Sequence, residues 1–169
     1  MTAVPHRTAA IIWGSTVVRI ALGGVLVAAG ALKALDPQSS VAAVRAYRLL
    51  PKALETVVGW ALPFAEIALG LLLMAGIATR VLAVLSAGLL VIFIGAVISA
   101  AARGLSIDCG CFGGGGEVPA GGTAYGVEIA RDLGFLTLAG WLVRHPRSRF
   151  ALGPTAPETD VEEVSGGRA

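Results

Sequence analysis

Cys109 and Cys111 are the residues whose type and spacing indicate chemistry most directly. One glycine separates them, and Phe112 and a run of four glycines follow. Cα atoms two residues apart are at most about 7 Å apart, close to the roughly 4.4 to 6.8 Å that a disulfide requires. A disulfide closed over so short a segment would be strained, and strain makes a disulfide easier to reduce. The spacing therefore favours thiol–disulfide exchange over structural bracing.

Two other interpretations of the cysteine pair stay open. Two thiolates also suit a soft metal such as Cu(I), although the sequence assigns no metal site. The pair could equally belong to a non-catalytic loop that holds a client protein. Phe112 either anchors this loop in the membrane interface or lines the approach of a partner thiol or a quinone ring. Two cysteines are too few for a disulfide framework or for the four ligands of a structural zinc.

The composition indicates the setting of this dithiol. Of the 169 residues, 56% are hydrophobic and only 14% are charged, whereas about a quarter of residues are charged in soluble domains. The chain is therefore expected to be an integral membrane protein in contact with lipid. A net charge of +2 is too small to indicate nucleic-acid binding.

Four apolar segments are each long enough to cross a bilayer, which takes about 20 helical residues. They cover residues 11–35, 54–77, 81–102 and 126–143. The sequence thus predicts an all-α fold, a four-helix transmembrane bundle. A cleaved signal peptide is the alternative for the first segment, but Arg19 interrupts it and it is too long. Gly88 and Gly95 share one face of the third segment and predict a close helix contact there.

The connections between these segments are polar. Asp36-Pro37 ends the first helix, because proline disfavours the helical conformation in the residue before it. Residues 38–52 predict a short amphipathic helix at the membrane interface. The cysteine loop follows the third segment. The domain therefore covers residues 11–145, with an N-terminal tail over 1–10 and a C-terminal tail over 146–169 that is expected to be disordered.

Three ionisable residues near or within the spans are candidate supporting residues. Glu66 lies near mid-span, where a carboxylate usually has a partner. Either it pairs with Arg19 or Arg131, which is slightly favoured, or it serves as a proton acceptor or quinone contact. Arg131 and Asp132 lie early in the last segment. A cation there can lower the pKa of a nearby thiol, although a salt-bridged helix end is the plainer interpretation.

Four spans place both termini on one side of the membrane. Counting lysines and arginines at the helix ends gives five on each side, so the positive-inside rule does not decide the orientation. Disulfides persist in oxidising compartments. We therefore expect a multi-pass protein of the cell membrane with the cysteine loop on the extracytoplasmic side.

Several short motifs together carry a resemblance over residues 15–145. They are the early Arg19, Gly30-Ala31-Leu32-Lys33-Ala34-Leu35-Asp36-Pro37, Leu62-Pro63-Phe64-Ala65-Glu66-Ile67-Ala68-Leu69-Gly70, Cys109-Gly110-Cys111-Phe112-Gly113 and Arg131-Asp132-Leu133. In this combination the chain resembles the MauE branch of the DoxX-like membrane proteins. The resemblance implies a four-helix membrane bundle associated with periplasmic thiol chemistry, and with maturation of the disulfide-rich small subunit of methylamine dehydrogenase. Asp132 stands where many such proteins have Asn.

The arrangement is also similar to vitamin K epoxide reductase, in which a dithiol lies beside a quinone site. This chain lacks the Cys-x-x-Cys motif and the second cysteine pair of that enzyme, so its chemistry is not carried over. No cofactor is fixed, and a quinone remains a candidate.

The function predicted from the sequence is thiol–disulfide exchange through Cys109 and Cys111. Its partner would be a thioredoxin-like or other extracytoplasmic thiol protein, and it would support protein maturation. The supporting residues are Glu66, Arg131, Asp132 and Phe112. The alternatives are a non-catalytic membrane assembly factor and a thiolate protein that binds or transports a metal.

Overall fold

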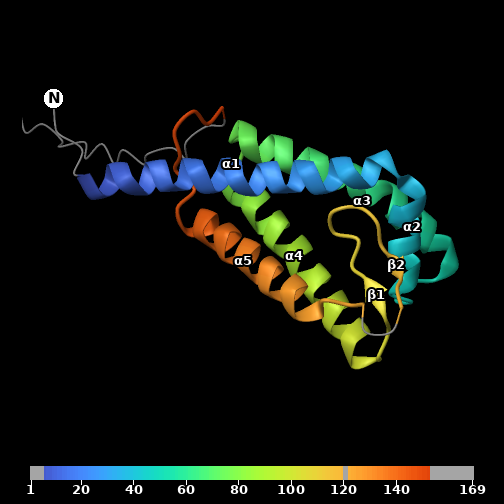
Figure 1. Ribbon diagram of the computed structural model, residues 1–169. Coiled ribbons are helices and arrows are strands. Elements are labelled where there is room, and N and C mark those ends of the chain that lie inside the picture. Colours follow the sequence, from blue (N-terminus) through green and yellow to red (C-terminus); the bar gives the residue numbers. More distant parts are fainter. Residues whose placement is uncertain (1–5, 120–121, 153–169) are drawn as a thin grey trace, which may run out of the picture.

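The computed structural model describes residues 6–119 and 122–152, which form a mostly helical protein (Figure 1). The elements are α1 (His6–Leu35), α2 (Pro37–Ala46), α3 (Lys52–Ala75), α4 (Thr79–Ala102), β1 (Ile107–Asp108), β2 (Gly116–Glu117) and α5 (Tyr125–Arg144). Each of the four long apolar segments thus folds as one long helix. The short helix expected after the first of them is α2.

The long helices form two pairs. α1 packs along α3, and α4 packs along α5. The two pairs diverge, and α2 and the two strands lie between their open ends (Figure 1). A buried core that includes Leu22, Leu73 and Leu142 holds the pairs together where they converge. The divergence matters because it leaves room for the cysteine loop between the pairs.

Glycines set the close contact between α1 and α3. A Cβ atom on Gly23 would lie 2.8 Å from the carbonyl oxygen of Gly70, and one on Gly30 would lie 2.5 Å from that of Pro63. Only glycine permits such an approach. No helix of this chain makes the contact expected at Gly88 and Gly95: among the described residues, no atom outside their own helix lies within 4 Å of a Cβ built at either position.

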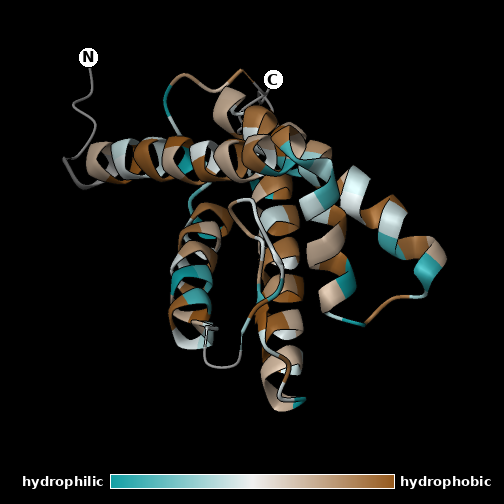
Figure 2. Cartoon of the chain, turned by 45° about the vertical axis from the view of Figure 1, so that its right-hand side comes forward, coloured by the Kyte–Doolittle hydropathy of each residue, from teal (hydrophilic) through white to brown (hydrophobic). Residues whose placement is uncertain are grey.

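Among the described residues, three helical segments are long and apolar enough to cross a membrane: Ala9–Leu35, Lys52–Ala75 and Thr79–Ala102. Their outer faces expose large apolar side chains, including Val17, Phe64 and Ile92, and Figure 2 shows the hydrophobic colour along most of their length. Soluble monomers rarely expose such surfaces. The predicted fourth span is the helix α5, but it is not apolar enough by the same measure. A fourth crossing, and termini on one side, therefore stay predictions.

Asp36 joins the first helix to the interfacial segment. Its carboxylate accepts a hydrogen bond from the backbone N–H of Ser39 at 3.1 Å, which caps α2, and Pro37 occupies the first turn. Proline is favoured there because the first N–H groups of a helix have no partner within it. The Ser40 hydroxyl then donates to the Gly59 carbonyl of α3 at 2.8 Å. α2 is thereby fixed on α3.

The first residues after α5 lie against α1 and α3, at the end of the molecule away from α2. The Arg19 side chain donates to the Arg149 carbonyl at 3.0 Å, and the Arg149 N–H donates to the Thr16 hydroxyl at 2.9 Å. The Leu152 N–H also reaches the Ala75 carbonyl at 3.0 Å. This part of the predicted C-terminal tail is thus held by α1 and α3. Residues 153–169, and residues 1–5 of the N-terminal tail, lie outside the described residues.

Candidate functional site

The cysteine loop is the tip of a small β-hairpin. β1 and β2 pair antiparallel, with Ile107 opposite Glu117 and Asp108 opposite Gly116. Ile107 is buried against Ala46 of α2 and Ala100 of α4. The hairpin is therefore anchored between the two helix pairs, and the cysteines follow directly after its first strand.

Two glycines let the loop lie flat on α2. Gly110 has φ +66° and Gly115 has φ +104°, values that residues with a side chain rarely adopt. A Cβ atom on Gly110 would also lie 2.7 Å from the Cβ of Ala43, and one on Gly115 would lie 2.5 Å from it. Gly110, the residue between the cysteines, is thus required for both backbone conformation and space.

The two thiols are free and face each other. Their Sγ atoms are 2.9 Å apart, and the Cys111 backbone N–H points to the Cys109 Sγ at 3.4 Å. The hydrogen bond between the two sulfurs lowers the pKa of Cys109, and the Arg131 guanidinium, 3.7 Å from the Cys109 sulfur, acts in the same direction against the effect of burial. The same hydrogen bond, together with burial, raises the pKa of Cys111. Of the two sulfurs, Cys109 is therefore the one at which a thiolate is favoured.

Arg131 is held in place from two sides. Its Nε atom donates to the Asp132 carboxylate at 3.0 Å, and its guanidinium lies 5.0 Å from the centre of the Phe112 ring. Asp132 is buried, and Phe112 is partly exposed. Five residues predicted from the sequence thus meet in one cluster: the two cysteines, Arg131, Asp132 and Phe112.

Tyr47, the residue that follows α2, fixes the loop from the other side. Its hydroxyl donates to the Cys109 carbonyl at 3.4 Å, and Arg103 donates to the Tyr47 carbonyl at 2.6 Å. Burial raises the pKa of Tyr47. The phenol therefore stays neutral and remains a hydrogen-bond donor to the loop.

Two carboxylates lie next to Cys109. Ligand atoms of Asp108, Cys109 and Glu128 all lie within 4.8 Å of one another, and Asp108 also accepts a hydrogen bond from the Gly110 N–H at 3.0 Å. This spacing would suit a metal ion. The guanidinium of Arg131, however, already places a positive charge 3.7 Å from the same sulfur.

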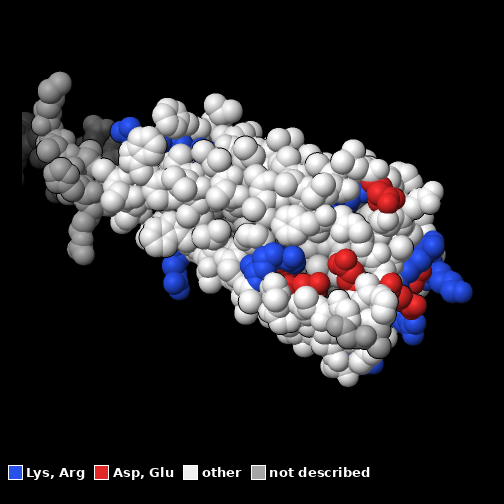
Figure 3. Space-filling view, viewed as in Figure 1, with Lys and Arg blue, Asp and Glu red and all other residues white. Residues whose placement is uncertain are grey.

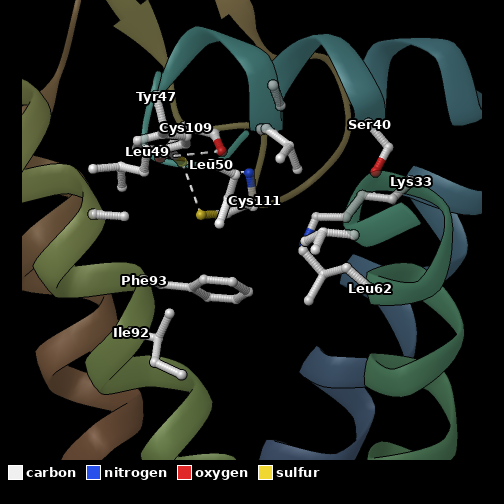
Figure 4. Close-up of a pocket in the computed structure, with 15 residues that line it drawn as sticks. Lys33, Ser40, Tyr47, Leu49, Leu50, Leu62, Ile92, Phe93, Cys109 and Cys111 are labelled. Atoms are coloured by element: carbon white, nitrogen blue, oxygen red, sulfur yellow. Dashed lines mark hydrogen bonds between the residues drawn. The ribbon is translucent and has the colours of Figure 1, made fainter. Parts of the chain in front are cut away.

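A cavity of about 220 Å³ extends from the cysteines between α2, α3 and α4. Its walls are mostly apolar, with Leu62 from α3 and Ile92 and Phe93 from α4. The Cys111 sulfur points into it above the Phe93 ring (Figure 4). Lys33, from the end of α1, lines the cavity on another side. The cavity wall is thus mostly apolar, and its polar lining consists of the cysteines, the Lys33 ammonium group and the side chains of Ser40 and Tyr47.

Glu66 lies apart from the cysteine cluster. Its carboxylate pairs with Lys33 at 2.6 Å, and the two side chains are only 1% and 5% exposed. The expected partners, Arg19 and Arg131, were wrong: Arg19 binds the Arg149 carbonyl and Arg131 binds Asp132. Glu66 therefore borders the cavity only through Lys33.

Three residues of the site were missed from the sequence: Lys33, Tyr47 and Phe93. For Lys33 a signal existed, since an ionisable residue at the end of an apolar span needs a partner just as Glu66 does. Tyr47 and Phe93 carried no such signal, because aromatic residues are common in apolar helices and at membrane interfaces.

Charged side chains gather at the end of the molecule that holds this site. In Figure 3, red and blue atoms cluster over α2 and the strands, while the flank of α1 is largely white. The exposed pair of Arg48 and Glu117, 2.7 Å apart, belongs to this end. The dithiol therefore lies at a polar end of the molecule, beyond the apolar flanks of the long helices.

Long helices with apolar outer faces and a dithiol loop at a polar end define a multi-pass helical membrane protein. The family model described as "Methylamine utilisation protein MauE" matches residues 11–145. The chain therefore belongs to the MauE family, as its motifs predicted. No curated protein and no solved structure matches it.

Proposed function

We propose that this chain is a membrane thiol–disulfide exchange protein that oxidises dithiols of an extracytoplasmic client. The observation that carries the proposal is the pair of free thiols, with Sγ atoms 2.9 Å apart and the Arg131 guanidinium 3.7 Å from the Cys109 sulfur. Membership of a family named for methylamine utilisation supports clients of the methylamine dehydrogenase kind.

The exchange begins with the Cys109–Cys111 disulfide form. A client thiolate attacks the Cys111 sulfur, so that a mixed disulfide forms and the intramolecular S–S bond breaks. Cys109 leaves as a thiolate, because the better stabilised thiolate leaves faster. A second client thiolate then attacks the client sulfur of the mixed disulfide and releases Cys111, which takes up a proton. The client has lost two electrons, and the chain is left as thiolate and thiol.

The surrounding residues act on this pair in distinct ways. Arg131 stabilises the Cys109 thiolate, and Asp132 orients Arg131 through its 3.0 Å hydrogen bond. Phe112, 39% exposed beside the guanidinium, offers an apolar contact to a docking thioredoxin-like or other thiol protein. The proposal places this loop on the extracytoplasmic side, where client disulfides are stable.

The first test is the reduction potential of the pair in the purified protein, measured by trapping thiols with an alkylating reagent across a glutathione redox series. A potential between about −120 and −270 mV, the range of thiol-exchange proteins, is expected. A pair that never forms a disulfide under oxidising conditions contradicts the proposal.

The second test is the capture of the client through one cysteine. In Cys109→Ala, Cys111 can still attack the disulfide of an oxidised client, which is the reverse of the exchange and releases one client thiolate. The mixed disulfide so formed has no resolving cysteine within the chain, so we expect it to accumulate and to be isolated with the client. Arg131→Met should slow exchange in the otherwise intact protein, because the leaving thiolate loses its cation. Arg80→Met, at the exposed start of α4, is the matched control. Equal rates for both arginine variants would remove Arg131 from the mechanism.

One observation favours a second function, metal binding, because Asp108, Cys109 and Glu128 converge within 4.8 Å. Titration with Zn²⁺ or Cu(I) against a chromophoric chelator tests it. Binding that is lost in Glu128→Gln, in a protein whose cysteines do not form a disulfide, would favour this function. A passive assembly factor is distinguished by client maturation that persists when both cysteines are serine.

A further inference from the structure

The cavity beside Cys111 has the features of a binding site for a small ring. Its volume of about 220 Å³ exceeds the roughly 150 Å³ of an apolar protein cavity that binds benzene. Side chains such as Val44, Leu62 and Phe93 form its walls. A single apolar ring with a few small substituents would therefore fit in the cavity, whereas a peptide or a nucleotide would be too large.

The polar groups of the cavity narrow the choice of ligand. Lys33 keeps N–H donors beyond the one that it gives to Glu66 at 2.6 Å, since an ammonium group has three. Its Nζ atom lies 5.2 Å from the centre of the Phe93 ring, beside the apolar wall. An ammonium donor facing an apolar cavity suits a carbonyl oxygen carried by a ring. A lipid acyl chain would leave this donor without a partner.

The entrance lies where lipid is expected. Ile92 and Leu49, which line the cavity, are 66% and 50% exposed. Ile92 belongs to a helix long and apolar enough to span a membrane. A ligand that dissolves in the bilayer would therefore reach the cavity from the side, without crossing the polar end of the molecule.

We propose that this cavity binds the ring of a lipid-soluble quinone, which accepts the electrons of the Cys109/Cys111 dithiol. The proposal rests on the function proposed above, because each client dithiol that is oxidised leaves the chain reduced and in need of a two-electron acceptor. Lys33 would donate a hydrogen bond to one quinone carbonyl, and Cys111 would face the ring.

The step balances in atoms and electrons. The S–S bond forms between Cys109 and Cys111, and two electrons pass to the quinone. One quinone oxygen takes the proton of the Cys111 thiol. The other takes from solvent the proton that Cys109 lost on becoming a thiolate. The products are the disulfide form of the chain and the quinol, and the disulfide form is the one that oxidises the next client.

The test uses the purified, reduced, full-length protein in detergent micelles, with decylubiquinone as the probe under anaerobic conditions. Loss of quinone absorbance and loss of alkylatable thiols are followed together. Ala96→Phe and Val58→Phe fill the cavity from α4 and α3. Ala101→Phe, an exposed position on α4 outside the cavity, is the matched control. Each variant is also assayed for exchange with glutathione disulfide.

We expect the wild type and Ala101→Phe to consume quinone in proportion to the thiols lost. Both cavity variants should reduce the quinone more than about tenfold more slowly, which is equivalent to the loss of some 1.4 kcal/mol of binding free energy. Their exchange with glutathione disulfide should be unchanged. Equal quinone reduction by all four proteins overturns the proposed site. A wild type that exchanges with glutathione but leaves the quinone untouched overturns the inference and spares the proposed function. Failure of both reactions defeats the proposed function itself.

A second readout needs no variant. Decylubiquinol, the reduced and unreactive product, should slow alkylation of Cys111 when it occupies the cavity, because the Cys111 sulfur points into it. Alkylation that is unchanged at saturating quinol contradicts binding at this place.

Discussion

Breaking the buried ion pair of Lys33 and Glu66 should destabilise the protein severely. The two groups are 2.6 Å apart and almost fully buried, so removal of one partner leaves an uncompensated charge in an apolar environment. Such a loss costs about 3 to 5 kcal/mol. At about 1.4 kcal/mol per factor of ten, Lys33→Met or Glu66→Gln should thus raise the equilibrium constant for unfolding by roughly two to three and a half powers of ten.

The chain offers a matched control that differs mainly in burial. Arg48 and Glu117 are 2.7 Å apart but 63% and 69% exposed, and an exposed pair contributes only about 0 to 1 kcal/mol. Glu117→Gln should therefore be nearly neutral. The double variant Lys33→Met/Glu66→Leu leaves no buried charge, so it should recover most of the stability that either single change loses.

The assay is unfolding in mixed micelles of a mild detergent and dodecyl sulfate, followed by fluorescence of the three tryptophans. Free energies of unfolding are compared for the wild type, the two single variants, the double variant and the Glu117 control. If Lys33→Met and Glu66→Gln cost no more than Glu117→Gln, the pair is not buried as described and the reasoning fails. Glu66 would then be free for a role in proton transfer.

The remaining predictions concern the loop. Gly110→Ala should separate the thiols and slow disulfide formation, because the new Cβ atom would clash with Ala43. Gly104 is the matched control, since it has a similar φ of +65° but no atom near its Cβ position. Gly104→Ala should therefore lower stability without changing the dithiol. As pH falls from 9 to 7, alkylation of Cys109 should decline less than that of a free thiol with a pKa near 8.5, since its lowered pKa keeps the thiolate present. Cys111→Ala removes the first cause of that lowered pKa, so it should slow alkylation of Cys109 at pH 7, and Arg131→Met should do so to a smaller extent. Equal rates of Cys109 alkylation in the wild type and both variants would show that neither Cys111 nor Arg131 stabilises the thiolate.

The helices and their breaks could be predicted from the sequence, because both depend on local composition. Apolar runs of about 20 residues define candidate spans, and Asp36-Pro37 marks the end of α1 at Leu35. The fourth span shows the limit of this argument. α5 has the expected length, but its polar residues leave the choice between a span and an interfacial or bundle-facing helix to its neighbours.

What the sequence could not supply was the register of one helix against another. Pairing of Lys33 with Glu66 requires that α1 and α3 meet at Gly23 and Gly30. Nothing in the spacing of these glycines distinguishes them from Gly88 and Gly95, which face no helix among the described residues. Small residues permit close packing, but the partner decides which of them are used.

The placement of the site follows from this packing rather than from the cysteine motif alone. Because α1 and α3 are held together by glycine, and α4 and α5 form a separate pair, the space between the pairs is wide enough for a loop and a cavity. The loop meets Arg131 on one side and the cavity on the other. This packing places the dithiol between a cation at a polar end and an apolar cavity, which is the arrangement that the proposed transfer of electrons from a client to a membrane-soluble quinone would require.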